Sequence, residues 1–370
     1  MQEMYYYWLH NITGIGRVTI QKILKYTTPE ELYKSEMEKK LQFLTRKQVE
    51  EIVKSRKHWN LQKEWEILKK RNINLLMIGN QNYPEKLAKI SDAPPVLYHK
   101  GKINILEKPS VAVIGARACS NYGKLMAKEL GRELAKMGIV TVSGMARGID
   151  SICQWTSLEN GGESVGVLGC GVEVCYPPEN RILFERLQKE GCLLSENAPF
   201  TKPDARLFPL RNRLISGLAD VVVVVEAREK SGTLITVDMA LEQGKEVYAV
   251  PGRMTDFVSI GCNKLIKQGA GMILSTQEFL EEICPILKLK YKPTETMVQE
   301  ALSFIEMKIV DYIGTSFKTI EEIYQEMRRR NIEISLTRVM EMVLNLQMKK
   351  IIKGENGYYF CDKIPVATKD

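Results

Sequence analysis

The chain has 370 residues, 44% of them hydrophobic and 26% charged. This composition excludes wholesale disorder and collagen-like structure, and the length predicts two or three domains. No apolar run approaches the roughly 20 residues that cross a bilayer, and the N-terminus lacks the basic and apolar regions of a signal peptide. We therefore expect a cytoplasmic protein without a membrane segment.

Charge is distributed unevenly along the chain, whose net charge is +8. Residues 1–79 carry 15 basic and 9 acidic side chains, whereas residues 80–285 carry 24 of each. Charge therefore favours a polyanionic partner only for the N-terminal part. In the neutral middle part, only a local cluster of cations would mark an anion site.

Histidines and cysteines limit the possible chemistry. The three histidines are His10, His58 and His99, so no later residue can supply an imidazole for a Ser-His-Asp triad or a zinc site. The eight cysteines are scattered without a C-x-x-C pair, which predicts buried, reduced thiols. We expect neither a metal nor a cofactor.

Residues 1–79 form the first predicted domain, which is helical. Apolar residues recur at three- and four-residue spacing in residues 20–24 and 59–68. The turn Ile12-Thr-Gly-Ile-Gly-Arg17 resembles a helix-hairpin-helix, in which backbone amides at a helix N-terminus meet a phosphate. We favour the simpler interpretation, a tight turn between helices in which glycine supplies a positive φ.

Strands and helices alternate in residues 80–287. Strongly apolar strands separated by amphipathic helices are typical of an α/β domain with a parallel sheet covered on both faces, whose binding sites lie at the carboxyl ends of the strands. The predicted strands are residues 111–114, 139–142, 164–168, 192–194, 221–225 and 246–250, and the predicted helices are residues 122–137, 149–158, 181–189, 213–218 and 233–242.

A basic segment at residues 288–295 predicts a linker, and residues 296–362 form a third predicted domain. Its pattern of three helices followed by a hairpin around Glu355-Asn-Gly357 resembles a winged helix. Modules of this kind often bind DNA through the last helix, but residues 336–348 offer only Arg338 before the end of that helix. A protein contact or a regulatory role is therefore as well supported as DNA binding.

Glycines in the middle domain follow predicted strands and come with basic or hydroxyl residues. Amide-rich turns at helix N-termini suit anions, because unpaired N–H groups and the helix dipole point the same way. The dinucleotide fingerprint fails because Val174 replaces its third glycine, and no Gly-Lys pair has the Walker A spacing. The turns are Gly115-Ala-Arg117, Ser143–Asp150, Gly169–Gly171 and Lys230–Thr236.

The densest cationic segment is Phe208-Pro-Leu-Arg-Asn-Arg213. Guanidinium groups pair with phosphates and a phenylalanine face stacks on any base, so this composition suits single-stranded nucleic acid. The alternative makes the phenylalanine a core residue and pairs the arginines with Asp204, Asp220 or Glu226.

The predicted grouping of cations at one edge of the sheet favours the nucleic-acid interpretation. Several cations of a domain without net charge are predicted to follow strands that end at the same edge, and an anion accounts for their grouping. These cations are Arg117, Arg147, Arg211, Arg213 and Lys230.

The motifs of the middle domain also occur in a particular order. They are Tyr83–Leu87, Pro95–Tyr98, Val113–Arg117, Ser143–Asp150, Leu168–Val172, Tyr176-Pro177, Asn180, Ser195-Glu196, Phe208–Arg213, Val225–Ala227, Ser231–Thr236, Val250–Gly252, Gly261–Ile266 and Gly269-Ala270. In residue types and in order they resemble the DNA-processing protein A (DprA/Smf) family over about residues 80–275.

The resemblance implies an extended Rossmann domain at residues 80–287 that binds single-stranded DNA and forms a homodimer. It also implies a RecA-type recombinase as a partner, which the protein loads onto incoming, protected DNA during natural transformation. The N-terminal helices would form a sterile-alpha-motif-like or helix-hairpin-helix-like domain.

By position, the resemblance implies phosphate contacts from four cations and a stacking or wedging role for Phe208. The backbones of Gly144, Gly148 and Gly232 would approach the strand closely. Ala116 stands where many members have serine. The phosphate contacts would be Arg117, Arg147, Arg211 and Lys230, and Arg213 and Ser231 complete the predicted site.

An enzyme is the alternative to a non-catalytic mediator. Phosphoribohydrolases that activate cytokinins use similar glycine-rich turns around a nucleotide phosphate, and Glu226 and Arg147 would be the catalytic pair. Their P-G-G-x-G-T signature is absent, and Lys230-Ser-Gly-Thr233 is the nearest stretch. A nucleotide sensor with a DNA-binding winged helix is a further alternative. We predict the mediator.

Overall fold

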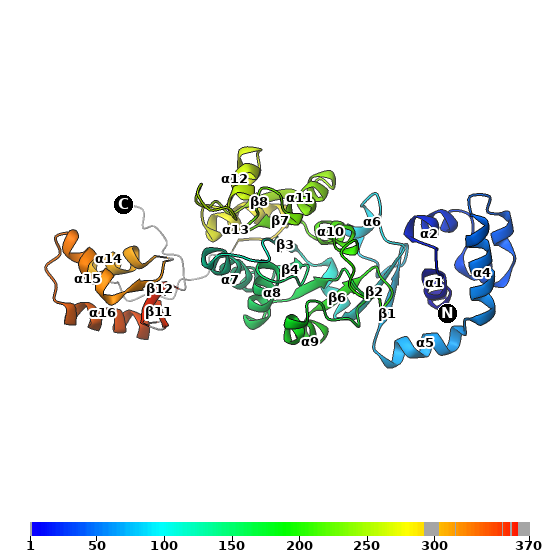
Figure 1. Ribbon diagram of the computed structural model, residues 1–370, viewed down its shortest axis with the longest axis horizontal. Coiled ribbons are helices and arrows are strands. Elements are labelled where there is room, and N and C mark those ends of the chain that lie inside the picture. The colour runs from blue at the N-terminus through cyan, green and yellow to red at the C-terminus, as the bar shows by residue number, and fades with distance from the viewer. Residues whose placement is uncertain (1, 292–302, 315, 350, 356, 362–370) are drawn as a thin grey trace.

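The computed structural model describes residues 2–291, 303–314, 316–349, 351–355 and 357–361 (Figure 1). Its N-terminal part is helical and buries an apolar core that includes Trp8, Ile20 and Ile52. Capping boxes at Thr28 and Thr45 begin two of the helices. The helices are α1 (Gln2–His10), α2 (Arg17–Leu24), α3 (Pro29–Lys34), η1 (Met37–Lys40), α4 (Arg46–His58) and α5 (Leu61–Lys70).

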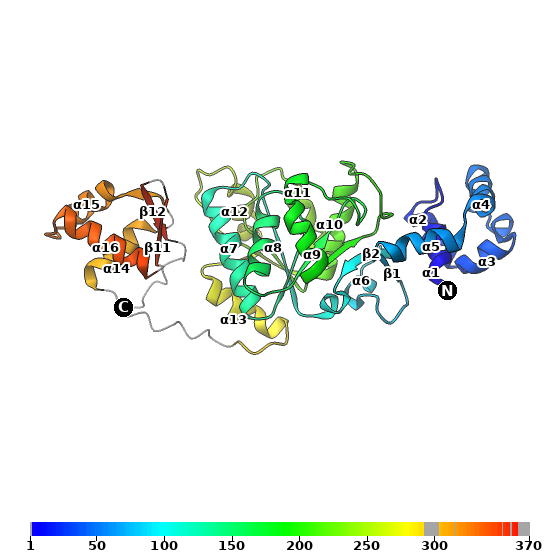
Figure 2. The same cartoon turned by 90° about the horizontal axis from the view of Figure 1, so that it is seen from below.

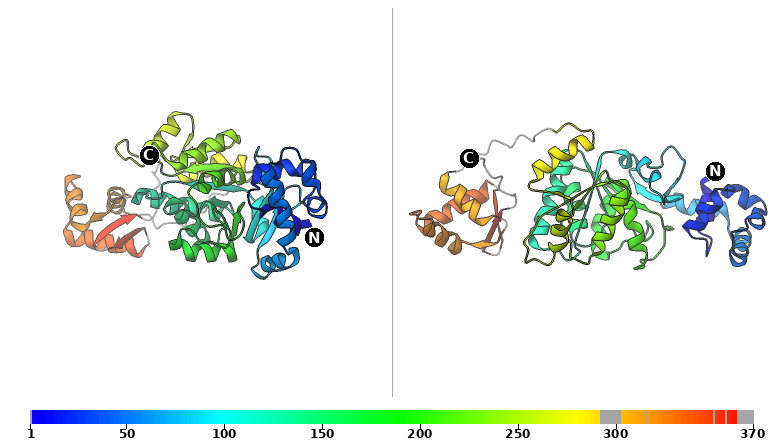
Figure 3. Two further views of the ribbon diagram at one scale, coloured as in Figure 1. Left: turned by 45° about the vertical axis from the view of Figure 1, so that its right-hand side comes forward. Right: turned by 90° about the horizontal axis from the view of Figure 1, so that it is seen from above.

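The turn between α1 and α2 is tight, with Gly14 at a φ of +77°. A side chain at this position would be strained, which explains the glycine. The N-terminal helices lie against the end of the sheet formed by β1 and β2 (Figure 3). Arg17 pairs with Asp92 at 2.8 Å across this contact, and the His10 ring lies 2.9 Å from the Tyr98 hydroxyl.

The middle of the chain forms a nine-stranded sheet with the order β1-β2-β6-β5-β4-β3-β7-β8-β9. Seven of these strands, from β6 to β9 in that order, are parallel, and β1 and β2 add an antiparallel pair beside β6. The strands are β1 (Asn74–Met77), β2 (Val96–Gly101), β3 (Ser110–Ile114), β4 (Val140–Ser143), β5 (Ser164–Val167), β6 (Cys192–Ser195), β7 (Val221–Val224), β8 (Glu246–Ala249) and β9 (Gly271–Met272).

Helices cover both faces of this sheet. Figure 2 shows α7, α8 and α9 side by side on one face, and α13 packs on the same face beside α7. Helices α6, α10, α11 and α12 pack against the other face. Their bounds are α6 (Glu85–Ala88), α7 (Asn121–Lys136), α8 (Ile149–Glu159), α9 (Arg181–Glu190), α10 (Leu207–Leu218), α11 (Gly232–Glu242), α12 (Ile260–Lys267) and α13 (Thr276–Ile286), with short turns η2 (Ile103–Glu107) and η3 (Pro178–Asn180).

The order in which the chain adds strands to the sheet changes direction once. From β3 it adds strands outward to β6 and then returns through α10 to place β7 on the other side of β3. The carboxyl ends of β3 and β7 therefore flank the topological switch point, which is where ligands bind in sheets of this kind.

Two predictions about element boundaries were wrong. Residues 74–77, assigned to the helical domain, form β1 and pair with β2 in the main sheet. The helix predicted at residues 213–218 begins at Leu207, because Pro209 is accommodated in the first helical turn, where its missing N–H needs no partner.

Within its described residues, the C-terminal module contains three helices and a three-stranded antiparallel sheet of order β10-β12-β11. Its core includes Ile309, Ile323, Val343 and Ile352. Parts of the predicted linker and of the first helix, and the turn residue Asn356, lie outside the described residues. The elements are α14 (Phe304–Ile313), β10 (Lys318–Thr319), α15 (Ile320–Arg329), α16 (Leu336–Met348), β11 (Ile352–Glu355) and β12 (Tyr358–Cys361).

The eight cysteines are all free thiols, and six of them are buried. Burial raises the pKa of Cys192 to about 12, so this thiol stays protonated. Within the described part of the chain, no helix combines the length and the apolarity that a membrane span requires.

Candidate nucleic-acid interface

The loops that follow the parallel strands meet at one edge of the sheet, the carboxyl edge. Arg117 follows β3, Arg147 follows β4 and Lys230 follows β7, and all three side chains are exposed. These three predicted cations are thus available to an anion at the switch point.

An aromatic stack lies at the same edge. The Phe208 ring, in the first turn of α10, stacks on the Tyr176 ring with centroids 5.3 Å apart and planes 28° apart. The guanidinium of Arg117 lies over the Phe208 ring, 5.9 Å from its centroid. Phe208 is half-buried and Tyr176 is 37% exposed, so this stack combines aromatic faces with a cation at the surface.

Gly169 allows the Phe208 ring to lie against the loop that follows β5. A Cβ atom at position 169 would lie 2.6 Å from Cδ1 of the ring, closer than van der Waals contact permits. The glycine pair of the Gly169–Gly171 turn therefore serves packing: at Gly171 a Cβ would collide with the carbonyl oxygens of Ala198 and Pro199.

Arg147 is exposed but paired. Its Nε donates to Oε1 of Glu179 at 2.7 Å, and the two side chains are 55% and 56% exposed. Surface pairs of this kind contribute little to stability, so a phosphate can compete with the carboxylate. A backbone hydrogen bond, together with the hydrogen bond from Arg147, lowers the pKa of Glu179.

Lys230, Ser231 and Gly232 lead into the N-terminus of α11. Ser231 caps this helix, accepting a hydrogen bond from the Thr233 N–H at 3.2 Å. A Cβ atom at Gly232 would meet nothing within 4 Å, so the backbone at this position is open to a ligand. The exposed ammonium and the helix N-terminus both favour an anion.

Arg211 is buried, whereas the sequence predicted a surface position for it. Its side chain is 5% exposed, and Nη1 donates to the carbonyl oxygens of Gly144, at 2.9 Å, and Val167. Burial lowers the pKa of Arg211 to about 10, and the charge of Asp150 partly offsets this effect. Arg211 therefore ties the loop after β4 to the end of β5, and we remove it from the phosphate contacts.

Arg213 is buried as well, at 3% exposure. Its Nε donates to Asp92 at 2.6 Å and its Nη2 to Glu196 at 2.5 Å. Neither carboxylate was among the partners considered from the sequence; Asp204 pairs instead with Arg206. Because its guanidinium is buried and bound to these two carboxylates, Arg213 also leaves the set of predicted phosphate contacts.

Two of the three predicted glycines are explained by internal packing. A Cβ atom at Gly144 would lie 2.6 Å from the Arg211 guanidinium. Gly148 has a φ of +77°, and a Cβ there would lie 2.3 Å from the Ala116 carbonyl oxygen. Their close neighbours are other parts of this protein, so only Gly232 keeps an open face.

The N-terminus of α7, at the switch point, is occupied by a carboxylate of the protein itself. Glu226 is 1% exposed, and it accepts hydrogen bonds from the Ser120 N–H at 2.9 Å and the Ser120 hydroxyl at 2.5 Å. A Cβ at Gly123 would lie 2.4 Å from this carboxyl group. A nucleotide phosphate would have to displace Glu226 to bind here.

Comparison with protein families agrees with the motif order. The model of the family described as DNA recombination-mediator protein A matches residues 74–284. The chain belongs to this family. The DNA processing protein DprA of Bacillus subtilis (strain 168) is 43% identical over 216 residues, which are 58% of this chain and 73% of that protein. DprA of Streptococcus pneumoniae (strain ATCC BAA-255 / R6) is 42% identical over 200 residues, 54% of this chain and 71% of that protein.

Solved DprA structures confirm an α/β fold with a large, mostly parallel sheet. The X-ray structure of DNA processing protein A from S. pneumoniae matches 78% of this chain and 99% of its own, with a TM-score of 0.67 and 32% identity. A structure of the Helicobacter pylori protein matches 58% of this chain and 96% of its own, with a TM-score of 0.53 and 32% identity. The latter work describes a unique single-stranded DNA binding mode of the H. pylori protein.

The structure places further residues at the carboxyl edge that were not predicted as site residues. Tyr176 was noted only as part of a motif, although a tyrosine in a loop after a strand can stack on a base. Arg228 and Arg253 are exposed on the loops after β7 and β8. Both arginines follow a predicted strand, and this position in the sequence could have identified them as candidates.

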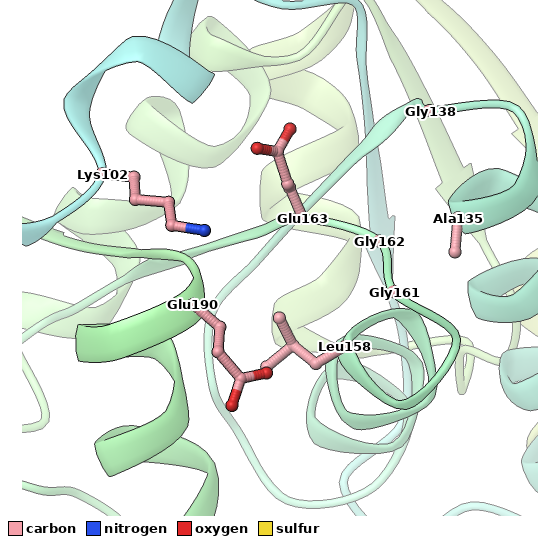
Figure 4. Close-up of a pocket in the computed structure, with 8 residues that line it drawn as sticks. All are labelled: Lys102, Ala135, Gly138, Leu158, Gly161, Gly162, Glu163 and Glu190. Carbon is pink, nitrogen blue, oxygen red and sulfur yellow. The ribbon is translucent and has the colours of Figure 1, made fainter.

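One pocket lies away from the carboxyl edge of the sheet. Figure 4 shows one of about 320 Å³ that is lined by Lys102, Glu163 and Glu190, with Gly138 and Gly161 beside it. Glu163 directly precedes β5, so this pocket belongs to the amino-terminal edge of the sheet, opposite the aromatic stack. Its mixed charges do not favour a phosphate. Among the described residues, no group of three or more His, Cys, Asp and Glu side chains is placed to hold a metal ion.

Proposed function

We propose that this recombination-mediator family member binds single-stranded DNA along the carboxyl edge of its sheet. The stack of Tyr176, Phe208 and Arg117 carries this proposal, because an unpaired base can extend an exposed aromatic stack whatever its sequence. The bases of a duplex are stacked on each other and do not offer a free face, so single strands should be preferred.

Phosphate contacts would come from cations on both sides of the switch point. Arg117 and Lys230 flank it, and Arg147 lies one strand further along. The open N-terminus of α11 at Gly232 would add backbone amides. This set revises the one expected from the sequence by removing Arg211, Arg213, Gly144 and Gly148.

The same geometry disfavours the phosphoribohydrolase alternative. Both oxygens of Glu226 are bonded to Ser120 inside the protein. The carboxylate of the proposed catalytic pair is therefore engaged elsewhere. We propose that the protein is not an enzyme; incubation with AMP followed by chromatography should detect no released adenine.

Fluorescence anisotropy with labelled single-stranded and duplex oligonucleotides tests the aromatic stack. We expect tighter binding of the single strand, and a loss of about 5- to 160-fold in affinity for Phe208→Ala, the range for one stacked base. Tyr26→Ala, which removes an exposed aromatic side chain from the N-terminal part, is the control. Equal affinity of wild type and Phe208→Ala, with both folded by circular dichroism, would contradict the proposed site.

A salt series tests the cations. For single strands, each phosphate contact contributes about 0.7 to the slope of log affinity against log salt concentration. Arg117→Ala should reduce the slope by about this amount, whereas Lys128→Ala, at an exposed position on α7, should leave it unchanged. Identical slopes for wild type and Arg117→Ala would exclude a phosphate contact at position 117.

A homodimer through the Rossmann domain is part of this proposal. The edge strand β9 and the residues after it expose apolar side chains: Met272 is 44% and Leu274 is 68% exposed. Apolar groups at an open sheet edge favour association with a second copy. Sedimentation should show a dimer that Leu274→Arg dissociates, and an unchanged mass for that variant would move the interface elsewhere.

We further propose that the protein acts in the cytoplasm and loads a RecA-type recombinase onto single-stranded DNA, with natural transformation as the setting. Family membership supports this role. The C-terminal module would be a winged helix and the N-terminal helices a sterile-alpha-motif-like or helix-hairpin-helix-like domain, with domain limits at residues 1–73, 74–287 and 296–362. Strand exchange by a RecA-type recombinase on DNA coated with single-strand-binding protein should accelerate when this protein is added.

A further inference from the structure

The loop between β8 and α12 carries two strongly exposed apolar side chains. Met254 is 90% and Phe257 is 79% exposed. The loop follows a parallel strand, so it lies at the same carboxyl edge as the Phe208 stack. Large apolar side chains in full contact with water, on a loop at a binding edge, indicate a contact with a ligand or partner.

Hydrogen bonds hold this loop in place beside the loop that follows β7. The Ala227 N–H donates to the Val258 carbonyl at 2.7 Å, and the Gly261 N–H donates to the Ala227 carbonyl at 2.8 Å. Asn263 bonds both backbone groups of Gly252, at 2.9 and 3.2 Å. Phe257 is thereby presented on a fixed backbone, one residue from a bond to the β7 loop.

The two hydrogen-bonded loops, after β7 and after β8, carry more exposed cations than unpaired carboxylates. Arg228, Lys230 and Arg253 are exposed, and none of them has an ion-pair partner in the described part of the chain. Glu229 is neutralised by Lys264, which leaves Asp256 as the exposed carboxylate of the loop. An aromatic side chain among unpaired cations matches a polyanion with aromatic groups better than it matches a protein.

We propose that Phe257, with Met254 beside it, forms a second base-stacking subsite for single-stranded DNA. This inference rests on the proposed function and extends it to a DNA path with a stacking site at each end. From β5, whose loop holds Phe208, to β8 there are four inter-strand steps. At about 4.8 Å each they span about 19 Å, which about six stacked nucleotides cover at 3.4 Å per nucleotide.

Photocrosslinking of the wild-type protein tests the path directly. A series of 12-mers, each with one 5-iodouracil at a different position, would be irradiated in complex with the protein and the crosslinked peptides identified by mass spectrometry. We expect crosslinks to Phe257 from positions about six nucleotides away from those that crosslink to Phe208 or Tyr176. Crosslinks to Phe208 or Tyr176 alone would overturn the second subsite and leave the proposed function standing. The absence of crosslinks, with no binding in solution, would instead remove the proposed function.

Oligonucleotide length provides a second test. A 4-mer is too short to reach both ends of the path, so Phe257→Ala should bind it as wild type does, at the Phe208 stack. For 12-mers and longer strands we expect about a fivefold loss of affinity, the lower end of the range for one stacked base. Phe208→Ala, in contrast, should weaken binding of both lengths.

Sedimentation of Phe257→Ala tests whether Phe257 contacts DNA or a second copy of the chain. We expect its oligomeric state to equal that of the wild type. If the variant dissociates the oligomer and binds 12-mers as the wild type does, Phe257 contacts a second copy of the chain and the DNA subsite is excluded.

Discussion

Replacement of Arg213 tests whether this arginine stabilises the fold or binds DNA. Its guanidinium is buried between Asp92 and Glu196, at 2.6 and 2.5 Å, with its side chain 4% exposed. Glu196 is 10% exposed, whereas Asp92 is 38% exposed and also pairs with Arg17. Arg213→Met keeps most of the side-chain volume and removes the charge, so it leaves Glu196 as a buried carboxylate without its cation.

The loss of stability expected for Arg213→Met depends on how exposed each of the two carboxylates is. Breaking a buried ion pair by removing one partner costs about 3–5 kcal/mol. Because Asp92 remains partly solvated and keeps Arg17, we expect about 3 kcal/mol, at the lower end of the range. For a domain of this size this loss lowers Tm by about 6–12 °C. The double variant Arg213→Met/Glu196→Gln should recover part of the loss, because the stranded charge is gone.

Thermal unfolding by circular dichroism and the salt dependence of single-strand binding would be measured on the same variants. Arg213→Met should lower Tm and leave the salt slope unchanged, whereas Arg117→Ala should lower the slope and leave Tm within about 2 °C, as surface substitutions usually do. A reduced slope for folded Arg213→Met, without a loss of Tm, would refute the buried role and restore the phosphate contact.

Three further predictions concern the edge and the N-terminal contact. Glu179→Gln frees Arg147, and should raise single-strand affinity about two- to threefold at low salt in anisotropy titrations; no gain would mean that Arg147 does not reach the DNA. Gly169→Ala inserts a methyl group against the Phe208 ring, so we expect a loss of about 1–3 kcal/mol in the free energy of unfolding, measured with urea, together with weaker binding. Burial lowers the pKa of His10 from 6.5 to about 4, so the unfolded chain takes up a proton that the native state does not. The free energy of unfolding should therefore fall as pH drops from about 6.5 to 4, and His10→Gln should show a smaller decrease.

The local sequence pattern was sufficient to predict most of the helices and strands and the parallel sheet that they form. The run of five valines at residues 221–225 contains β7, and the apolar spacing of residues 122–137 predicted α7 almost to the residue. Apolar strands alternating with helices predicted a parallel sheet, because parallel strands need crossover connections that cover both faces. The glycine and cation motifs after strands predicted the edge at which the candidate site lies.

Helix α10 shows where the prediction of individual site residues went wrong. Arg211, Leu214, Ile215 and Leu218 are spaced three and four residues apart, and all four are buried on one face of α10. This spacing was visible in the sequence, but the predicted helix began six residues late, at residue 213. A helix that starts at Leu207 turns Arg211 inward and leaves Phe208 at the surface.

The class of fold, the family and the edge of the sheet where cations gather could be predicted from local patterns, because they depend on periodicity and on motifs within a few residues of each other. Which of these cations reach solvent depends on the tertiary structure. Arg213 meets Asp92, 121 residues away in the chain, and Arg211 meets the Gly144 carbonyl, 67 residues away. Whether a guanidinium is used inside the protein or offered to a phosphate depends on such distant partners, which no local pattern contains.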